Sequence, residues 1–321
     1  MLKILIVSGT FPPRRYGGVT KTTYLVAKKL AERGHEVTVF TTDVGNNEHE
    51  RLPVQGSEII NGIRVYYFRN LSNVIAFRQR ILLPPRMIPV LARSICNFDI
   101  VHLNGLRSFH DVAVSYYAKK YGVPYVQQAH GSLPRIKPKR ILKLFWDELF
   151  GRYLLRGATK VIALNRMETE LYRAVGVPEE KIVIIPNGID LSEYDKLPPK
   201  GSFKRKYNIP EDKRIILYLA RIDRIKGIDI LIKAYAYLIK KMNLKDSVLV
   251  IAGPDEGYLN EANSLVRRLS ISSYVLFTGP LYDRDKLEAL VDTNIYVLPS
   301  RYETFPMAVL EAYACGKPIV A

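Results

Sequence analysis

Short apolar runs alternate with longer stretches in which apolar residues recur every three or four positions. The short runs have the length and β-branched content of buried parallel strands, and the longer stretches have the period of helices that cover a sheet. In the first half the predicted strands are residues 3–8, 36–41, 64–68, 100–103, 125–128, 161–164 and 182–185, and the first predicted helix is residues 19–33. This alternation predicts an α/β fold built on a doubly wound parallel sheet.

The alternation stops after residue 190 and resumes after residue 206. Residues 191–206 place Pro198, Pro199 and Gly201 among Lys and Asp, a composition typical of a connection between domains. The second half then predicts strands 215–220, 248–252, 275–277 and 295–298, with helices 228–241, 258–269 and 284–291 between them. We therefore expect a first domain over 1–190, a linker over 191–206 and a second domain over 207–321. Two doubly wound sheets of this kind are expected to face a cleft, with ligands outside the carboxyl ends of the strands.

Composition narrows the class of protein without identifying it. The chain has 321 residues, of which 48% are hydrophobic and 25% charged, as in globular proteins that are not disordered. No apolar run is long enough to span a bilayer, and the first residues are a strand pattern rather than a signal peptide. Cys96 and Cys315 have neither metal nor disulfide spacing, so a cytoplasmic location is expected.

The positive charge is concentrated in the first half. Residues 1–190 hold 28 Lys and Arg against 15 Asp and Glu, a net of +13, whereas residues 191–321 hold 20 against 16, a net of +4. This asymmetry favours an anionic partner for the first half. Residues 139–156 and 73–93 are basic and amphipathic, which fits either contact with an anionic membrane surface or a solvated cover over the sheet. Nucleic acid is disfavoured, because no stacking or groove-reading motif accompanies the charge.

Several strand-to-helix loops of the first half carry residues suited to a ligand. Gly17 and Gly18 stand at the start of the first helix, where the backbone can approach a phosphate closely, although a plain flexible turn fits equally. His102 and His130 each end an apolar strand. His102 is interpreted as a core imidazole, while His130, followed by Gly131 in an open loop, is the candidate hydrogen-bond partner of a polar ligand.

In the second half, Arg221 and Lys226 flank a short loop that could hold two phosphates, although a solvated basic turn is the simpler alternative. Asp283-Arg-Asp285 resembles a metal-binding pair, but Asp283 directly precedes a helical pattern and is better explained as an N-cap. No obligatory metal is therefore expected.

The stretch from Ser300 to Pro318 holds two carboxylates eight residues apart, Glu303 and Glu311. Thr304 is the expected N-cap of the helix between them, and Pro306 is expected in its first turn. The helix N-terminus then offers free amides to an anion. A buried helix with two solvated acids remains the alternative interpretation.

The ordered set of motifs resembles the retaining glycosyltransferases of family 4, enzymes with the GT-B fold. The matching segments occur in the family's order across nearly the whole chain. They are Pro12-Pro with Gly17-Gly18, Gly34-His-Glu-Val37, Asp99-Ile-Val-His102, His130-Gly131, Ile185-Pro-Asn-Gly-Ile-Asp190, Arg221 with Lys226-Gly227, Pro299-Ser300, and Glu303 to Glu311 followed by Ala314-Cys-Gly-Lys-Pro318. Family members continue beyond the Gly-Lys-Pro strand, so the resemblance implies that the second domain is incomplete here.

The resemblance implies a role for each matching site residue. Arg221 and Lys226 would grip the diphosphate of a nucleotide-sugar donor and, with Glu303 and His130 at the sugar, form the catalytic set. The remaining donor contacts would be Gly17, Gly18, Thr304, Phe305, Met307 and, at the ribose, Glu311. Retention of configuration would proceed by front-face attack, without a metal and without an obligatory cofactor.

The expected function is thus transfer of a sugar from a nucleotide sugar to an acceptor hydroxyl. The acceptor could be a sugar, a lipid-linked sugar or a polysaccharide, and the enzyme could sit peripherally at the inner face of the membrane. Two alternatives stay open at this point: a nucleotide-sugar epimerase on the same fold, and a nucleotide-binding module without turnover.

Overall fold

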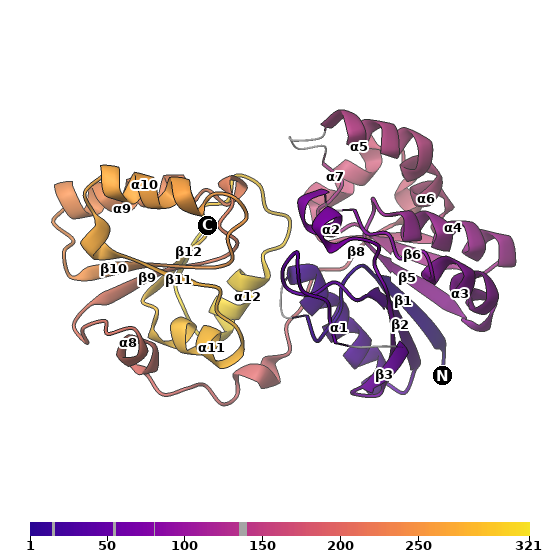
Figure 1. The fold of residues 1–321 in the computed structure, drawn as a ribbon, viewed down its shortest axis with the longest axis horizontal. Helices are drawn as coiled ribbons and strands as arrows, with labels where there is room; N and C mark the ends of the chain where they lie inside the picture. Colours follow the sequence, from indigo (N-terminus) through magenta and orange to yellow (C-terminus); the bar gives the residue numbers. More distant parts are fainter. Residues whose placement is uncertain (15–16, 54–55, 80, 135–139) are drawn as a thin grey trace. The chain divides into compact units, whose positions relative to one another are not determined.

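The computed structural model describes residues 1–14, 17–53, 56–79, 81–134 and 140–321. The chain divides into two compact units, Met1–Asn187 (unit 1) and Gly188–Ala321 (unit 2) (Figure 1). Each is a sheet covered by helices on both faces, and each is described below by itself.

Unit 1 is built on an eight-stranded sheet in the order β3-β4-β2-β1-β5-β6-β7-β8. All neighbouring strands are parallel except β3, which pairs antiparallel with β4 at the edge. The strands are β1 Lys3–Ser8, β2 Glu36–Thr42, β3 Gly56–Ile60, β4 Ile63–Phe68, β5 Ile100–Asn104, β6 Tyr125–Gln128, β7 Lys160–Ala163 and β8 Ile182–Ile184. The switch in strand order falls beside β1, so the carboxyl ends of β1, β5 and β6 are where ligands of such sheets bind.

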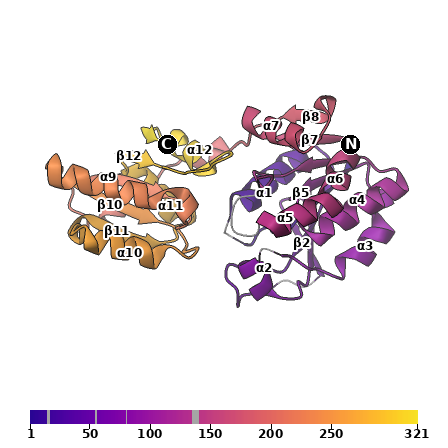
Figure 2. The same ribbon diagram turned by 90° about the horizontal axis from the view of Figure 1, so that it is seen from above.

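Successive residues of β1 point to opposite faces of this sheet and enter separate cores. Leu5 and Val7 join the core under α3, α4 and α6, whereas Ile4 and Ile6 join the core under α1. The helices α3, α4 and α6 lie side by side on their face (Figures 1 and 2). The helices of unit 1 are α1 Gly18–Glu32, α2 Asn73–Gln79, α3 Met87–Ser94, α4 Phe109–Tyr121, α5 Arg140–Trp146, a π-helical segment Asp147–Gly151, α6 Arg152–Gly157 and α7 Arg166–Ala174.

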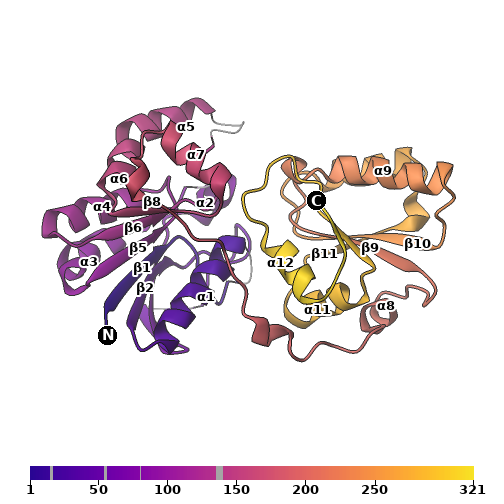
Figure 3. The same ribbon diagram turned by 180° about the vertical axis from the view of Figure 1, so that it is seen from behind.

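Unit 2 is a five-stranded, wholly parallel sheet in the order β11-β10-β9-β12-β13. Helices α9 and α10 cover one face, and α8, α11 and α12 cover the other (Figures 1 and 3). The elements are α8 Ser202–Lys206, β9 Arg214–Leu219, α9 Ile228–Lys241, β10 Ser247–Ala252, α10 Leu259–Arg268, β11 Val275–Gly279, α11 Asp283–Asp292, β12 Ile295–Val297, α12 Met307–Ala314 and β13 Ile319–Val320.

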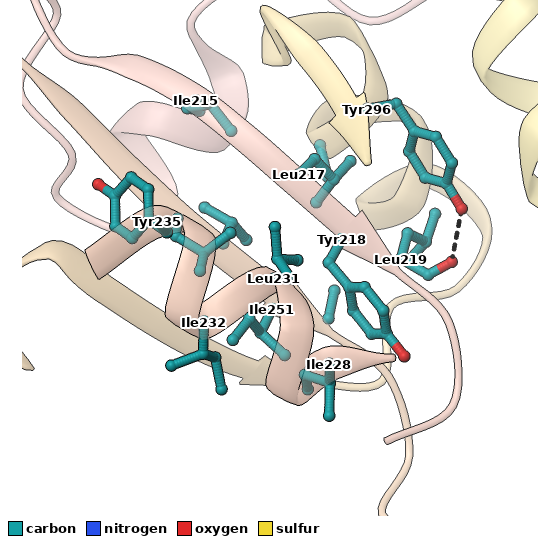
Figure 4. Close-up of a cluster of buried hydrophobic side chains, with 14 of the residues drawn as sticks. Ile215, Leu217, Tyr218, Leu219, Ile228, Leu231, Ile232, Tyr235, Ile251 and Tyr296 are labelled. Atoms are coloured by element: carbon teal, nitrogen blue, oxygen red, sulfur yellow. Dashed lines mark hydrogen bonds between the residues drawn. The ribbon is translucent and has the colours of Figure 1, made fainter. Parts of the chain in front are cut away.

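The core of unit 2 is one cluster in which apolar residues of β9 face those of α9 (Figure 4). Tyr218 and Tyr296 are fully buried at the carboxyl end of this core, and the Tyr296 hydroxyl donates a hydrogen bond to the Leu219 carbonyl oxygen at 3.1 Å. Burial raises the pKa of both phenols, which keeps them neutral. Their buried rings form the end of the apolar core next to the loops that follow the strands.

The predicted elements agree with the structure except at one strand, at some helix ends and at α8, Ser202–Lys206, which lies within the residues expected to be a connection. Strand β3 was not predicted, because Gly56–Ile60 has no buried apolar run and gains its partner only by antiparallel pairing with β4. The N-cap prediction for Asp283 is wrong: Asp283 is the first residue of α11, at φ 45°, and Tyr282 precedes it.

Candidate functional site

The loop after β9 carries Lys226 to the loop after β12, which carries Glu303. Residues Arg224–Lys226 form one 3₁₀ turn, capped by Asp223, whose carboxylate accepts from the Ile225 amide at 2.9 Å. The Lys226 ammonium forms an ion pair with the Glu303 carboxylate, and their side chains are only 13% and 27% exposed. The solvated-turn alternative for this lysine is therefore wrong, because the loop delivers it to a carboxylate 77 positions away in the sequence.

Arg221, in the same loop, is bound to an acid that the sequence interpretation did not single out. Its guanidinium pairs with Glu256, which follows β10, and lies 3.9 Å from Asp223. The Arg221 carbonyl oxygen accepts from the Tyr218 hydroxyl at 2.7 Å. Glu256 lies within Gly-Pro-Asp-Glu-Gly, a sequence that looks like an ordinary turn. Its position directly after a parallel strand is the one feature of the sequence that could have marked it as a candidate site residue.

Two glycines allow these loops to pack against one another. At Gly227, with φ 69°, a Cβ would overlap the carbonyl oxygen of Pro299. At Gly253, with φ 155°, a Cβ would overlap the carbonyl oxygen of Ala220. The loops after β9, β10 and β12 share one edge of the sheet because these strands are parallel, and glycine at the two crossings lets their backbones approach this closely.

Helix α12 begins later than predicted. It starts at Met307, with Pro306 at the N-cap in an extended conformation (ψ 108°), so Pro306 is not in the first turn and Thr304 is not the N-cap. The Thr304 hydroxyl instead donates to the Tyr302 hydroxyl at 3.2 Å. The physical reason is the proline ring, which disfavours helical backbone at Phe305 and delays the helix.

Glu311 projects from the second turn of α12 and is 4% exposed. The Lys286 ammonium, from α11, donates to its carboxylate at 2.8 Å. A buried carboxylate is tolerated because this cation accompanies it. Since Glu303 and Glu311 both pair with lysines, the alternative of two solvated acids is wrong; Lys286 itself was missed, because a lysine within a helix gives no local signal.

The candidate residues of unit 2 form one constellation. Burial is the main reason that the pKa of the Tyr218 and Tyr296 phenols is raised; Arg221 opposes the rise at Tyr218, while Glu303, at both phenols, and Glu311, at Tyr296, add to it. These charged side chains therefore lie near the same two neutral phenols. Cations, carboxylates and the helix N-terminus at Met307 together provide partners for a ligand that carries both phosphate and hydroxyl groups.

In unit 1, His130 occupies a left-handed turn (φ 49°) after β6, which non-glycine residues rarely adopt. Its Nε2 lies 2.8 Å from the Asn104 Oδ1 at the end of β5. The buried Glu168 carboxylate accepts from the amides of Gly131 (2.7 Å) and Leu164 (2.8 Å), and so supports the same turn. Asn104 and Glu168 were not singled out from the sequence, because their role depends on contacts between separate strands and helices.

The His130 imidazole is neutral at physiological pH. Burial, reinforced by the charge that His102 would carry, lowers the pKa of His130 to about 3. Burial also lowers the pKa of His102 to about 4, although a hydrogen bond with Gln128 at 3.1 Å opposes the shift. His102 is thus a satisfied core imidazole, as expected, and His130 is suited to hydrogen bonding rather than to carrying charge.

Gly17 (φ 109°) precedes α1, and Gly18 is the first residue of that helix. Arg15 and Tyr16, which complete the glycine-containing loop of the sequence analysis, lie outside the described residues. The glycines and His130 belong to unit 1, so their approach to the residues of unit 2 stays a prediction.

Two further properties concern the described residues as a whole. No group of three or more His, Cys, Asp or Glu side chains within them could hold a metal ion. No helix in the described ranges has the length and apolar character needed to cross a membrane.

Comparison with known families identifies the chain. Residues 16–193 match the model of glycosyltransferase family 4, and residues 199–321 match that of glycosyl transferases group 1. The chain belongs to glycosyltransferase family 4. It is accordingly a glycosyltransferase, and the epimerase alternative loses its support.

Relatives and solved structures agree with this assignment. A glycosyltransferase of Methanocaldococcus jannaschii is 29% identical over 99% of this chain and 80% of its own length. The D-inositol 3-phosphate glycosyltransferase of Kineococcus radiotolerans is 26% identical over 95% of this chain and 72% of its own. The crystal structure of Anabaena HepE in complex with UDP and glucose matches with a TM-score of 0.74 at 19% identity, over 100% of this chain and 80% of HepE. The family matches and these neighbours establish the GT-B fold, and they give no support to the expectation that the second domain is incomplete.

Proposed function

We propose that this glycosyltransferase moves a sugar from a nucleotide-sugar donor to an acceptor hydroxyl with retention of configuration. The observation that carries the proposal is the pairing of Lys226 with Glu303 at the carboxyl edge of the unit 2 sheet, beside Arg221. The D-inositol 3-phosphate glycosyltransferase and the UDP-bound HepE structure support a phosphate-containing ligand of this class.

Each residue takes the role that its chemistry permits. Arg221 and Lys226 bind the donor diphosphate and offset the negative charge that develops on the leaving group. Glu303 accepts from hydroxyls of the donor sugar, and Glu311 from the ribose hydroxyls. The free amides at Met307, after Thr304 and Phe305, face phosphate oxygens. From unit 1, neutral His130 hydrogen-bonds to the sugar, and Gly17 and Gly18 let backbone approach the donor.

In the reaction, the acceptor oxygen forms a bond to the anomeric carbon as the bond from that carbon to the diphosphate oxygen breaks. The acceptor proton passes to the departing phosphate on the same face, so no carboxylate serves as a nucleophile. Glu303 is ion-paired and positions the sugar. We further propose that the two cations, rather than a metal ion, neutralise the leaving group, so activity should persist in excess chelator.

A donor screen tests the activity. A panel of UDP-, GDP- and ADP-sugars is incubated with the protein, and both transfer and slow hydrolysis are measured. Lys226→Ala and Glu303→Ala should each lower kcat/KM by about 100-fold or more, since each removes a contact of the reacting donor. Lys213→Ala is the matched control, because Lys213 precedes β9 at the opposite edge and its ammonium donates to the Lys245 carbonyl oxygen at 2.6 Å. Wild-type rates in Lys226→Ala would contradict the assignment, and turnover of donor to a different nucleotide sugar without acceptor would indicate an epimerase.

We also propose that a surface of unit 1 contacts an anionic membrane, where a lipid-linked acceptor would be found. Ile141, Phe145 and Leu149, on α5 and the π-helical segment, are 71%, 63% and 67% exposed. Arg152 and Arg156 are exposed close by in the chain, and Lys139 lies outside the described residues. A large exposed apolar surface flanked by cations suits a bilayer with anionic headgroups better than water.

The other basic stretch, residues 73–93, supports contact with a membrane less strongly. Met87 and Leu91 of α3 are fully buried in the core, while Ile75 and Ile88 are 41% and 37% exposed. Val74 and Val90 are exposed to a similar degree, at 38% and 37%. The described part of the stretch therefore packs some of its apolar side chains in the core and leaves the others only partly exposed. Cytoplasmic location and the absence of nucleic-acid partners stay predictions.

Vesicle co-sedimentation tests the membrane surface. The wild-type protein should sediment with vesicles containing phosphatidylserine or phosphatidylglycerol and not with phosphatidylcholine alone. Phe145→Ser with Leu149→Ser should abolish sedimentation, whereas Tyr237→Ser, at a 61% exposed tyrosine of unit 2, should not. Equal binding to neutral vesicles, or no loss in the double variant, would contradict the proposal while leaving the sugar-transfer activity untouched.

A further inference from the structure

Arg301 links the loop that carries Lys226 to the loop that carries Glu303. Its amide donates to the Ile225 carbonyl oxygen at 2.8 Å, within the 3₁₀ turn before Lys226. Its guanidinium donates to the Arg224 carbonyl oxygen at 2.7 Å. Both the main chain and the side chain of Arg301 therefore hydrogen-bond to the turn that carries Lys226.

The same guanidinium is anchored to the first turn of α9. Its two terminal nitrogens donate to the two oxygens of Asp229, each at 2.7 Å, in the bidentate geometry that gives arginine–carboxylate pairs their directional specificity. Asp229 is only 14% exposed, and the arginine lowers the pKa of its carboxyl group. Three of the five guanidinium donors are thus committed to protein acceptors around the Lys226 turn.

These contacts surround, but do not include, the ion pair between Lys226 and Glu303. On one side of that pair the Gly227 backbone is pressed against the Pro299 carbonyl oxygen, and on the other Arg301 holds the turn. Glu303 is two residues beyond Arg301 in the chain. A shift at Arg301 would therefore move both members of the ion pair relative to each other.

We propose that Arg301 is a positioning residue of the transfer reaction. Through the Arg224 carbonyl and Asp229 it fixes the position of Lys226 relative to Glu303. The inference rests on the proposed function, because that function assigns the donor to Lys226 and Glu303. This role requires no contact of Arg301 with donor or acceptor. An ordinary surface ion pair contributes little to stability, so a purely structural role predicts nearly unchanged catalysis in its absence.

The test compares Arg301→Ala with a matched arginine–aspartate pair in the same sheet. Arg214→Ala is the control, since Arg214 begins β9 at the opposite edge and pairs with Asp246 at 2.5 Å. For the donor that the wild type uses, kcat/KM should fall by about 10- to 100-fold in Arg301→Ala, as expected when reacting groups lose register. Arg214→Ala should keep the wild-type value, and both variants should unfold at a similar temperature.

Two further variants separate positioning from general damage. Arg301→Lys retains the charge and the amide contact but cannot bind both Asp229 oxygens, so it should recover only part of the activity. Asp229→Ala added to Arg301→Ala should cost little more than Arg301→Ala alone, because both act through one contact. Full activity in Arg301→Ala, or a loss that follows the fraction unfolded, would overturn the inference.

Nucleotide binding separates this inference from the proposed function. Calorimetry with UDP, GDP and ADP first shows whether the wild type binds a nucleoside diphosphate, and no binding of any would contradict the proposed function. Where one binds, Arg301→Ala should weaken it several-fold, while affinity for the corresponding nucleoside, which lacks the phosphates, stays unchanged. Unaltered diphosphate affinity together with unaltered kcat would contradict the role of Arg301 alone.

Discussion

Lowering the pH from 7 to 5 should destabilise unit 1 through buried His102 and half-buried His130. In the folded state, burial lowers the pKa of His102 to about 4 and that of His130 to about 3. Both imidazoles have a pKa near 6.5 once the chain unfolds. Below that pH the imidazoles take up protons in the unfolded state but not in the folded state. The free energy of unfolding is therefore undiminished above pH 6.5 and falls as the pH is lowered toward the folded pKa values.

The expected loss is a substantial fraction of the stability of a typical domain, which is about 5–15 kcal/mol. Between pH 7 and pH 5, each histidine contributes about 2 kcal/mol of destabilisation, so the two together contribute at most about 4 kcal/mol. Glu168 offsets part of this, because burial raises the pKa of its carboxyl group and the folded state gains a proton there as the pH falls. His110, whose pKa is also lowered by burial, adds to the loss.

The single tryptophan makes unit 1 separately observable. Trp146 lies in α5, with its ring 4.8 Å from that of Phe109, so its fluorescence follows the unfolding of unit 1 in urea. The free energy of unfolding should be lower at pH 5 than at pH 7 by a few kcal/mol. In His102→Gln the dependence should be weaker, and in His49→Gln, at an exposed histidine, it should not change. A wild-type loss below about 1 kcal/mol, or an equal loss in His102→Gln, would refute the reasoning.

Two further predictions concern the stability of unit 2. Gly227→Ala should lower the free energy of unfolding by about 2 kcal/mol or more, because φ is 69° and the new Cβ meets the Pro299 carbonyl oxygen. Urea unfolding by circular dichroism measures this, with Gly188→Ala, where no atom lies within 4 Å, as the near-neutral control. Lys286→Met should cost about 2–3 kcal/mol by removing the cation beside buried Glu311, and adding Glu311→Leu should restore most of it. A double variant as unstable as Lys286→Met would contradict that account.

The succession of strands and helices could be predicted because buried parallel strands have a local signature. The bounds of β1, β6 and α9 coincide with the predicted ones. Strand β3 was not predicted, because its stability comes from pairing with β4 at the sheet edge and not from its own composition. The start of α12 was misplaced by the competition between a good capping residue, Thr304, and the constraint that Pro306 imposes on the residue before it.

The candidate site was predictable only in part. Arg221, Lys226, Glu303 and Glu311 were brought together by the family resemblance, since no local pattern connects residues 77 positions apart. Of their counterions, Glu256 had only its place after a strand as a signal, and Lys286 had no local signal at all. A turn and a helix are ordinary settings for charged residues, and only the fold reveals that each is the partner of a site residue.

These counterions change how donor binding should be understood. The three cations Arg221, Lys226 and Lys286 are each bound to a carboxylate. Under the proposed function, a diphosphate must compete with Glu303 for Lys226. When it succeeds, it frees the Glu303 carboxylate, which then needs new hydrogen-bond donors because it is largely withdrawn from water. The hydroxyls of the attached sugar supply them. A nucleoside diphosphate alone would break the same ion pair without that compensation, so under the proposed function the site would favour the intact donor over the leaving group.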